Sequence, residues 1–321
     1  SKRFLLVIAR YNNRQLFLIH IKPLCYYFLK GNFILMEEKK QLIINADDFG
    51  ISNSANQAVF AAFKNGVLTS TSLMANAPAF ENAINLIPEL KGISIGVHLN
   101  IIEFATLKEN PKEKSLLYDK NGNYNNNYLA LIQKSYNKDF LNEVEEDFRL
   151  QIETVMASTT VDHIDSHVHV HAIPEIFKIV CKLAREYGIK NIRTQFEYPY
   201  FVPDIKKYLS IKYPLNLIKI ALLNTFTLIN KKYLYDNFNE IKTNENFIGV
   251  NYTGYMDKNT LLYALKNVKQ RTEAILHPSF DTNDSLHYTE YQALINEEFK
   301  LAVKQAGIEL INFLNEKKSI V

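Results

Sequence analysis

Apolar and polar positions follow two alternating patterns from residue 41 onward. Short apolar runs with the length of β-strands are followed by longer stretches in which apolar residues recur every three or four positions, as on one face of a helix. The strand-like runs are 41–46, 70–75, 93–99, 161–166, 191–194, 247–251, 274–276 and 307–313. Strands separated by helices favour parallel pairing with right-handed crossovers, and eight such units predict a closed, TIM-like (β/α) barrel.

The stretches between the strands carry signals for helix ends. Ser52 precedes the first helical stretch, Gly66 ends it, and Pro174 stands in the first turn of another. The segment 203–238 is longer than one crossover helix requires and mixes lysines with Ile, Leu and Phe. It predicts a helical excursion that packs on the barrel, while a dimer face, a substrate lid and a membrane-surface contact are the open alternatives.

The first 35 residues differ in character from the rest. They carry six Lys/Arg and no Asp/Glu. Because the whole chain has a formal charge of +3, residues 36–321 carry a formal charge of −3. No uncharged apolar run there approaches the roughly 18–20 residues of a membrane span. Met36 looks like a natural start. We therefore predict that 1–35 is a peripheral or poorly ordered extension upstream of that start, and that 36–321 is one domain.

Composition narrows the function classes. The chain has 321 residues, of which 47% are apolar and 22% charged, enough for one large core. The small net charge argues against a nucleic-acid binder of the basic kind, and the slightly acidic body suits a cytoplasmic enzyme without stable membrane insertion. Two cysteines, Cys25 and Cys181, make neither a disulfide framework nor a cysteine zinc site. No Gly-x-Ser-x-Gly elbow, Walker loop or Gly-x-Gly-x-x-Gly occurs.

Ionisable side chains stand at the ends of several predicted strands. Active sites in parallel α/β folds lie where the carboxyl ends of the strands meet, so these residues are expected to converge although they are far apart in the sequence. They are Asp47 and Asp48 after the first strand, His98 after the third, His167 after the fourth, Arg193 at the fifth and His277 after the seventh.

Asp47 and Asp48 point to opposite sides if the backbone stays extended there, and a turn would bring both into the site. One carboxylate can then bind a divalent metal ion while its neighbour accepts a proton from a metal-bound water. The alternative is structural, because Asp is also favoured at the N-terminus of a helix that follows a strand.

The segment 163–171 is the strongest single signal. Its ionisable residues alternate with others, so an extended strand would place them on one face, where they require a metal ion or a polar cavity. They cannot all bind one ion, so some are expected to orient the metal ligands by hydrogen bonding or to contact the substrate. The residues are His163, Asp165, His167, His169 and His171.

The remaining candidates complete a hydrolytic site. His277 offers a proton donor opposite the base, and Arg193 could fix an oxyanion or orient Asp47. Glu197 could hold Arg193 or bind sugar hydroxyls. Hydrolysis of an amide or ester near neutral pH requires a metal, a base and an acid for the leaving group, and the sequence supplies candidates for each.

Four motifs together resemble the YdjC-like carbohydrate deacetylases, a group that includes chitooligosaccharide deacetylases. They are Asn-Ala-Asp-Asp-Phe-Gly at 45–50, Gly-Val-His-Leu-Asn at 96–100, His-Ile-Asp-Ser-His-x-His-x-His at 163–171 and Leu-His-Pro at 276–278. The resemblance covers about 41–315. It implies a TIM-like barrel, one divalent metal ion (Mg²⁺ or Zn²⁺), an acetylated sugar as substrate, and a homodimer.

Roles follow from the resemblance for individual residues. It implies that Asp48, His98 and His167 are the metal ligands, that Asp47 is the catalytic base and that His277 is the acid.

The chain departs from the family pattern at two places. Arg193 and Glu197 match a family Arg-x-Pro-x-Glu segment, but Gln195 stands in place of the proline. Ser279 follows His-Pro where the family commonly has glycine. Both departures lie at the rim of the expected site and bear on the identity of the substrate.

Two rival functions remain. Another divalent-metal amidohydrolase or phosphoesterase could use the same barrel, and two metals about 3.5–4 Å apart would favour it. A non-catalytic sugar-binding protein would never release acetate.

Overall fold

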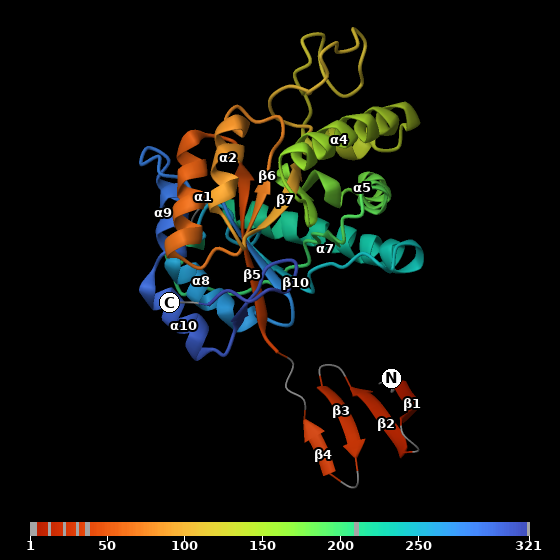
Figure 1. Ribbon diagram of the computed structural model, residues 1–321, viewed down its shortest axis with the longest axis vertical. Helices are drawn as coiled ribbons and strands as arrows, with labels where there is room; N and C mark the ends of the chain where they lie inside the picture. The colour runs from red at the N-terminus through yellow and green to blue at the C-terminus, as the bar shows by residue number, and fades with distance from the viewer. Residues whose placement is uncertain are drawn as a thin grey trace. The chain divides into compact units, whose positions relative to one another are not determined.

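The computed structural model describes the backbone of residues 5–11, 14–21, 24–29 and 32–35, and both backbone and side chains of residues 39–208 and 212–319, except that Ile205 is described by its backbone. Contacts divide the chain into two units, Ser1–Lys40 and Gln41–Val321. The first contains an antiparallel sheet whose strands pair in chain order (Figure 1): β1 (Leu5–Tyr11), β2 (Arg14–Ile21), β3 (Leu24–Leu29) and β4 (Asn32–Leu35). That residues 1–35 precede the natural start stays a prediction.

The second unit is built on a parallel sheet with the strand order β10-β11-β5-β6-β7-β8-β9. Each strand predicted from the apolar runs is present, with bounds that differ by a few residues, and all the pairs are parallel. The strands are β5 (Gln41–Phe49), β6 (Ser70–Leu73), β7 (Ser94–Leu99), β8 (His163–Ser166), β9 (Asn191–Ile192), β10 (Asn246–Ile248), β11 (Thr272–Leu276) and β12 (Glu309–Leu310).

The predicted closed barrel of eight strands needs a correction. β11 pairs directly with β5, so the eighth strand is not inserted between the seventh and the first. β12 pairs with only the first two residues of β5, because β11 and β6 occupy both edges of β5 farther along. β9 makes an isolated parallel bridge from Asn191 to Lys242, which precedes β10, and no ladder forms between β9 and β10 in the described residues. The architecture is a barrel-like α/β fold whose full closure the structure does not show.

Helices connect the strands and cover the sheet (Figure 1). Ser52 caps the first as predicted, since its Oγ accepts a hydrogen bond from the Ala55 amide at 3.1 Å, and Pro174 begins α5. The helices are α1 (Asn53–Asn65), α2 (Phe80–Leu86), η1 (Ile87–Glu89), α3 (Tyr128–Lys134), α4 (Lys138–Ser158), η2 (His167–Ala172), α5 (Pro174–Glu186), α6 (Ile205–Tyr208), α7 (Lys212–Asn237), α8 (Lys258–Ala264), η3 (Leu265–Asn267), α9 (Ser285–Leu294) and α10 (Glu297–Gln305).

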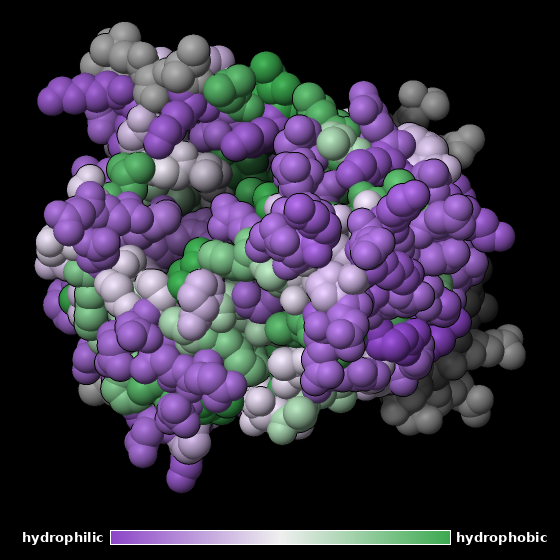
Figure 2. Space-filling view, turned by 90° about the horizontal axis from the view of Figure 1, so that it is seen from above, coloured by the Kyte–Doolittle hydropathy of each residue, from purple (hydrophilic) through white to green (hydrophobic). Residues whose placement is uncertain are grey.

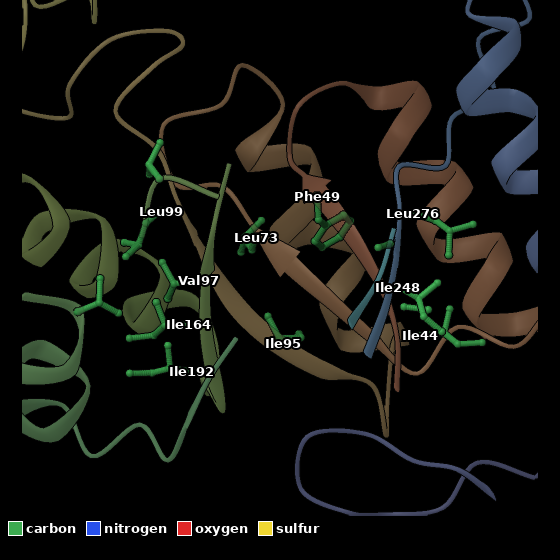
Figure 3. Close-up of a cluster of buried hydrophobic side chains, with 14 of the residues drawn as sticks. Ile44, Phe49, Leu73, Ile95, Val97, Leu99, Ile164, Ile192, Ile248 and Leu276 are labelled. Carbon is green, nitrogen blue, oxygen red and sulfur yellow. The ribbon is translucent and has the colours of Figure 1, made fainter. Parts of the chain in front are cut away.

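The two faces of the strands differ in chemistry because successive side chains point to opposite sides. The apolar side chains Val97, Leu99 and Ile164 belong to a buried cluster together with Ile44 and Leu73 (Figure 3). The residues between them in the sequence are polar and face the other side of the sheet. They are Asn45, Asp47, Ser72, His98 and Asp165, and all of them are buried. The pleat therefore separates the hydrophobic core from a polar interior that holds the candidate site.

The segment 203–238 forms α6 and α7, which confirms the predicted helical excursion. α7 packs inward through a stripe spaced three or four residues apart, namely Asn216, Ile220, Leu223, Thr227, Asn230 and Leu234. Several apolar side chains on its other faces are exposed, including Leu215, Ile218 and Leu228. Within the described residues, no helix is both long enough and apolar enough to cross a membrane.

Candidate active site

Asp47 and Asp48 enter the site through a break in the regular strand. The pairing of β5 with β6 shifts register between Ala46 and Phe49, and Asp48 has a φ of 61°. This bulge rotates Asp48 away from the side on which an extended strand would place it. The turn that was expected to bring both carboxylates into the site is therefore a bulge centred on Asp48 itself.

Asp48, His98 and His167 form a cluster that fits a divalent metal ion. Asp48 Oδ1 lies 3.1 Å from His98 Nε2 and 2.8 Å from His167 Nδ1, and one ligand atom from each residue lies within 4.8 Å of the others. Two imidazole nitrogens and a carboxylate oxygen are a usual ligand set for such ions. The other ring nitrogens face carboxylates, with His98 Nδ1 2.6 Å from Asp165 Oδ1 and His167 Nε2 3.6 Å from Glu103 Oε1. Such partners orient metal-binding histidines.

The charges in this cluster favour a cation. Burial by itself raises the pKa of Asp48, but His167 and His98 more than offset it and hold that pKa well below its usual range. Burial lowers the pKa of His98, but Asp165 and Asp47 raise it to about 10. Positive charge thus collects between buried carboxylates, as a proton or as a metal ion, and a metal competes with the proton for the same nitrogens.

Arg193 holds Asp47 in place through two hydrogen bonds. Its Nη1 and Nη2 donate to Asp47 Oδ2 and Oδ1 at 2.8 and 2.7 Å, and Asn45 Nδ2 donates to Asp47 Oδ1 at 2.7 Å. Its Nη2 lies 2.6 Å from Asp165 Oδ2, and its Nε donates to Glu273 Oε1 at 2.7 Å. The Arg193 side chain is fully buried. Of its two predicted roles, the geometry favours orienting Asp47 over contacting an oxyanion.

His277 has the carboxylate of Glu290 beside it. Glu290 Oε2 accepts a hydrogen bond from the His277 amide at 2.5 Å and lies 3.6 Å from His277 Nδ1. Burial lowers the pKa of His277, but Glu290 and, more weakly, Asp48 and Asp47 raise it to about 9. The imidazole is therefore charged near neutral pH, which suits a proton donor.

The prediction that the ionisable side chains of residues 163–171 share one face of a strand is wrong beyond the first of these residues. β8 ends at Ser166, and Val168 and His169 have positive φ values of 43° and 60° inside η2. A strand period cannot continue through such a turn. His167 consequently faces Asp48, whereas the His169 ring packs edge-on against Phe247 with its centroid at 5.7 Å.

The outer members of this segment support the site. The His163 ring stacks on Phe313, and its Nδ1 lies 2.7 Å from Asp162 Oδ1. His171 Nδ1 contacts Ser166 Oγ. Its Nε2 lies 3.1 Å from the carbonyl oxygen of Arg193 and 2.8 Å from Gln195 Nε2. Gln195, which stands where the family has proline, thus contacts His171, and His171 also lies against the Arg193 carbonyl.

Glu197 does not hold Arg193, and Glu273 takes that position. The Glu197 carboxylate accepts hydrogen bonds from the amides of Gly249, Val250 and Asn251 at 3.1, 2.8 and 3.0 Å. Burial raises its pKa to about 7. It therefore shapes the loop after β10, part of which lines the cavity described below.

Sequence reasoning missed Glu273 and Glu290. Glu273 lies in an apolar strand, four residues before His277 and on the same parity, so its charge in that position was a readable signal. Among the described residues, no group forms a hydrogen bond with Oε2 of this carboxylate, and burial raises the pKa of Glu273. Glu290 lies in α9, and the sequence offers no period that links it to His277.

A cavity of about 610 Å³ opens beside these groups. Figure 2 views the molecule from above, onto the carboxyl ends of the strands, and shows apolar surface beside a hollow in the otherwise polar face. The site residues on its wall are Asp47, His98, His167, His169 and His277. The cavity thus gives a ligand access to the predicted base Asp47, the predicted acid His277 and two of the predicted metal ligands.

Comparison with known proteins identifies relatives of this chain. The family model for the YdjC-like protein matches residues 41–305. A carbohydrate deacetylase of Clostridium beijerinckii is 31% identical over 280 residues, which cover 85% of this chain and 98% of that protein. Carbohydrate deacetylase 1 of Listeria innocua is 38% identical over 151 residues, or 46% of this chain and 59% of that one.

A solved structure supports the fold. The crystal structure of an Enterococcus faecalis V583 protein, described as a cellobiose-phosphate cleavage protein, superposes with a TM-score of 0.65 at 25% identity. The superposition covers 86% of this chain and 98% of the other.

Proposed function

We propose, from the premise that this chain belongs to the YdjC-like protein family, that it is a metal-dependent carbohydrate deacetylase that hydrolyses the N-acetyl group of an acetylated sugar. One observation carries the proposal. The Asp48–His98–His167 cluster, the Arg193-held Asp47 and the charged His277 all lie at one cavity. These are the parts that amide hydrolysis requires.

The metal site would be formed by Asp48, His98 and His167. When bound there, Mg²⁺ or Zn²⁺ supplies Lewis acidity toward the acetyl carbonyl and lowers the pKa of water. The supporting carboxylates of Asp165 and Glu103 keep the two imidazoles turned toward Asp48.

The protein's own groups handle the protons. Asp47 takes a proton from the attacking water as the water oxygen bonds to the acetyl carbon, and Arg193 fixes both oxygens of Asp47 for that transfer. The carbon–nitrogen bond then breaks, and charged His277 gives its proton to the departing amine. The products are acetate and an amino sugar. Glu290 keeps His277 charged, so the acid is ready near neutral pH.

A two-metal hydrolase fits these residues less well. A second group of potential ligands exists, formed by Asp47, His98 and Asp165. The Arg193 guanidinium already contacts both of these carboxylates. A second cation would meet that fixed positive charge in a buried site, so the arrangement favours one metal ion. A sugar-binding protein without activity has no need for an arginine-held carboxylate and a charged histidine at one cavity.

The direct test is acetate release from N-acetylglucosamine and its oligomers by the full chain. We expect release that stops with a chelator and returns when Mg²⁺ or Zn²⁺ is added back, and metal analysis should find one ion per chain. Failure to release acetate from every substrate, with metal bound, would reject deacetylation. Two ions per chain would instead support the amidohydrolase or phosphoesterase alternative.

The homodimer and the cytoplasmic location are further parts of the proposal. Size-exclusion chromatography with light scattering tests the first, and a monomeric mass at working concentrations would contradict it.

A further inference from the structure

The loop between β7 and α3 reaches the site at Glu103. The Glu103 Oε1 atom lies 3.6 Å from His167 Nε2, and the neighbouring Ile102 lines the cavity. The Glu103 side chain is 50% exposed, so its position depends largely on the backbone that carries it. The next residue, Phe104, has a φ of 66°, and a residue other than glycine keeps such a left-handed backbone only where its surroundings fix it. We call residues 100–106 the Glu103 turn.

Asn100 fixes the beginning of the Glu103 turn. Its Oδ1 accepts hydrogen bonds from the amides of Ile102 and Glu103 at 3.0 and 3.1 Å, and its Nδ2 donates to the Glu103 carbonyl at 2.6 Å. The backbone of Asn100 is held in turn by Gln151 of α4. The Gln151 Oε1 accepts from the Asn100 amide at 2.9 Å, and its Nε2 donates to the Asn100 carbonyl at 2.7 Å. Both side chains are fully buried, so α4 fixes the loop where it leaves β7.

Two limbs of the loop pair with each other beyond Glu103. The Tyr124 amide donates to the Phe104 carbonyl at 3.0 Å, and the Thr106 amide donates to the Gly122 carbonyl at 2.9 Å. The end of the Glu103 turn is therefore tied to a segment that lies much farther along the chain. Whatever holds this pair of limbs also holds the strained residue beside Glu103.

Asp147 of α4 joins the two limbs. Its Oδ1 accepts a hydrogen bond from Thr106 Oγ1 and its Oδ2 accepts one from Tyr124 Oη, which is one hydroxyl from each limb. Gln151 Nε2 donates to the same Oδ2 at 2.8 Å. The Asp147 side chain is almost fully buried, where hydrogen bonds to a charged group are strong and losing one leaves a costly unpaired group. One helix therefore holds the Glu103 turn at both of its ends.

We propose that Asp147 is a positioning residue for the metal site: by holding both limbs of the loop, it fixes the Glu103 turn and keeps the Glu103 carboxylate beside His167. The inference rests on the proposed function, because His167 is one of the metal ligands in that proposal. Without Asp147 the strained turn relaxes, Glu103 moves away, and the His167 imidazole loses the partner that orients it.

The residue before Asp147 supplies a matched control. Glu146 Oε2 lies 2.9 Å from Lys108 Nζ and 3.6 Å from Lys112 Nζ, so it also joins α4 to this loop. Its side chain is 56% exposed, and ion pairs that are so exposed contribute little. Glu146→Ala thus removes a contact between the same helix and the same loop without touching the buried carboxylate.

The test is the dissociation constant of Zn²⁺ alone, measured on the full chain by competition with a chromophoric chelator. Asp147→Ala removes both acceptor oxygens and should weaken Zn²⁺ binding by about tenfold, the usual loss when a partner of a ligating histidine is disturbed. Glu146→Ala should stay within about twofold of the parent. Should Asp147→Ala not fold by circular dichroism, Tyr124→Phe removes one hydroxyl, keeps the ring, and should weaken binding several-fold.

A double-mutant cycle shows whether Asp147 acts through Glu103. Glu103→Ala should itself weaken Zn²⁺ binding by about tenfold, and adding Asp147→Ala, or Tyr124→Phe in its place, should cost no more than about twofold further. A general loss of stability would instead multiply with the loss from Glu103→Ala.

Each outcome decides the proposal. Unchanged affinity in the folded variant, equal loss in Glu146→Ala, or losses that multiply in the cycle would overturn the role of Asp147. A parent chain that binds no Zn²⁺ would overturn the metal site and this inference with it. Zn²⁺ binding as expected, without acetate release from any acetylated sugar, would overturn the deacetylase function and leave the role of Asp147 standing.

Discussion

Replacing Glu290 by Gln removes the negative charge beside His277 but keeps a hydrogen-bond acceptor for the His277 amide. The Gln amide oxygen can still accept the hydrogen bond from the His277 amide that Glu290 Oε2 accepts at 2.5 Å. What is lost is the negative charge 3.6 Å from His277 Nδ1. The other charges that act on the ring are Asp48 and Asp47, whose influence on its pKa is weaker than that of Glu290.

The size of the effect follows from the pKa of His277. Burial lowers it, and the carboxylates, Glu290 foremost, raise it from the ordinary 6.5 to about 9. The charged, donating form is then present below about pH 9 and is lost above it. If the pKa returned to 6.5, the charged fraction at pH 8 would fall from about nine-tenths to about 3%, roughly a thirtyfold loss of rate. At pH 6 the loss would be less than about twofold.

The assay is the pH–rate profile of acetate release between pH 5.5 and 10 for the parent chain, Glu290→Gln and a control. Glu297→Gln removes a carboxylate whose side chain is 81% exposed on α10 and should reproduce the parent. We expect the alkaline limb of Glu290→Gln to move to lower pH. An equal loss at every pH would show that Glu290 only holds the backbone, and an unchanged limb would show that His277 is not the acid.

Other predictions address the metal, the base, packing and the first unit. Asp47→Asn should keep its metal by elemental analysis but lose turnover by at least about a hundredfold, whereas Asp48→Asn should lose both; wild-type rates in either variant reject that residue's role. Gly96→Ala should lower the free energy of unfolding in urea by about 1–3 kcal/mol, because a Cβ there would lie 2.3 Å from His163 Nε2; an unchanged midpoint would contradict this. A chain starting at Met36 should retain full activity in the acetate assay, and loss of folding by circular dichroism would show that residues 1–35 are required.

Much of the site could be predicted because the sequence shows where the strands end. Apolar runs give the strands, and parallel pairing brings their carboxyl ends together, so Asp47, His98 and His277 were expected at one place and lie there. Sheet closure was not predictable, since it depends on which edge of β5 the last two-residue strand takes. The carboxylates behind the site were missed for a different reason. Glu290 contacts His277 only in the folded chain, and no sequence period links the two, whereas the charge of Glu273 within an apolar strand was a signal that could have been read.

The alternation that builds the hydrophobic core also explains why the backbone strain lies at Asp48, a proposed metal ligand. Along β5, Ile44 and Ala46 pack in the core while Asn45 and Asp47 face the polar interior, so strict alternation would send Asp48 into the core. The bulge and the positive φ of Asp48 return its carboxylate to the interior, at a cost of about 1 kcal/mol for the left-handed backbone. The contacts to His98 and His167 offset that cost only if Asp48 stays charged. The same carboxylate is therefore held by the groups with which it would bind a metal ion, and removing its charge should release the bulge together with the ion.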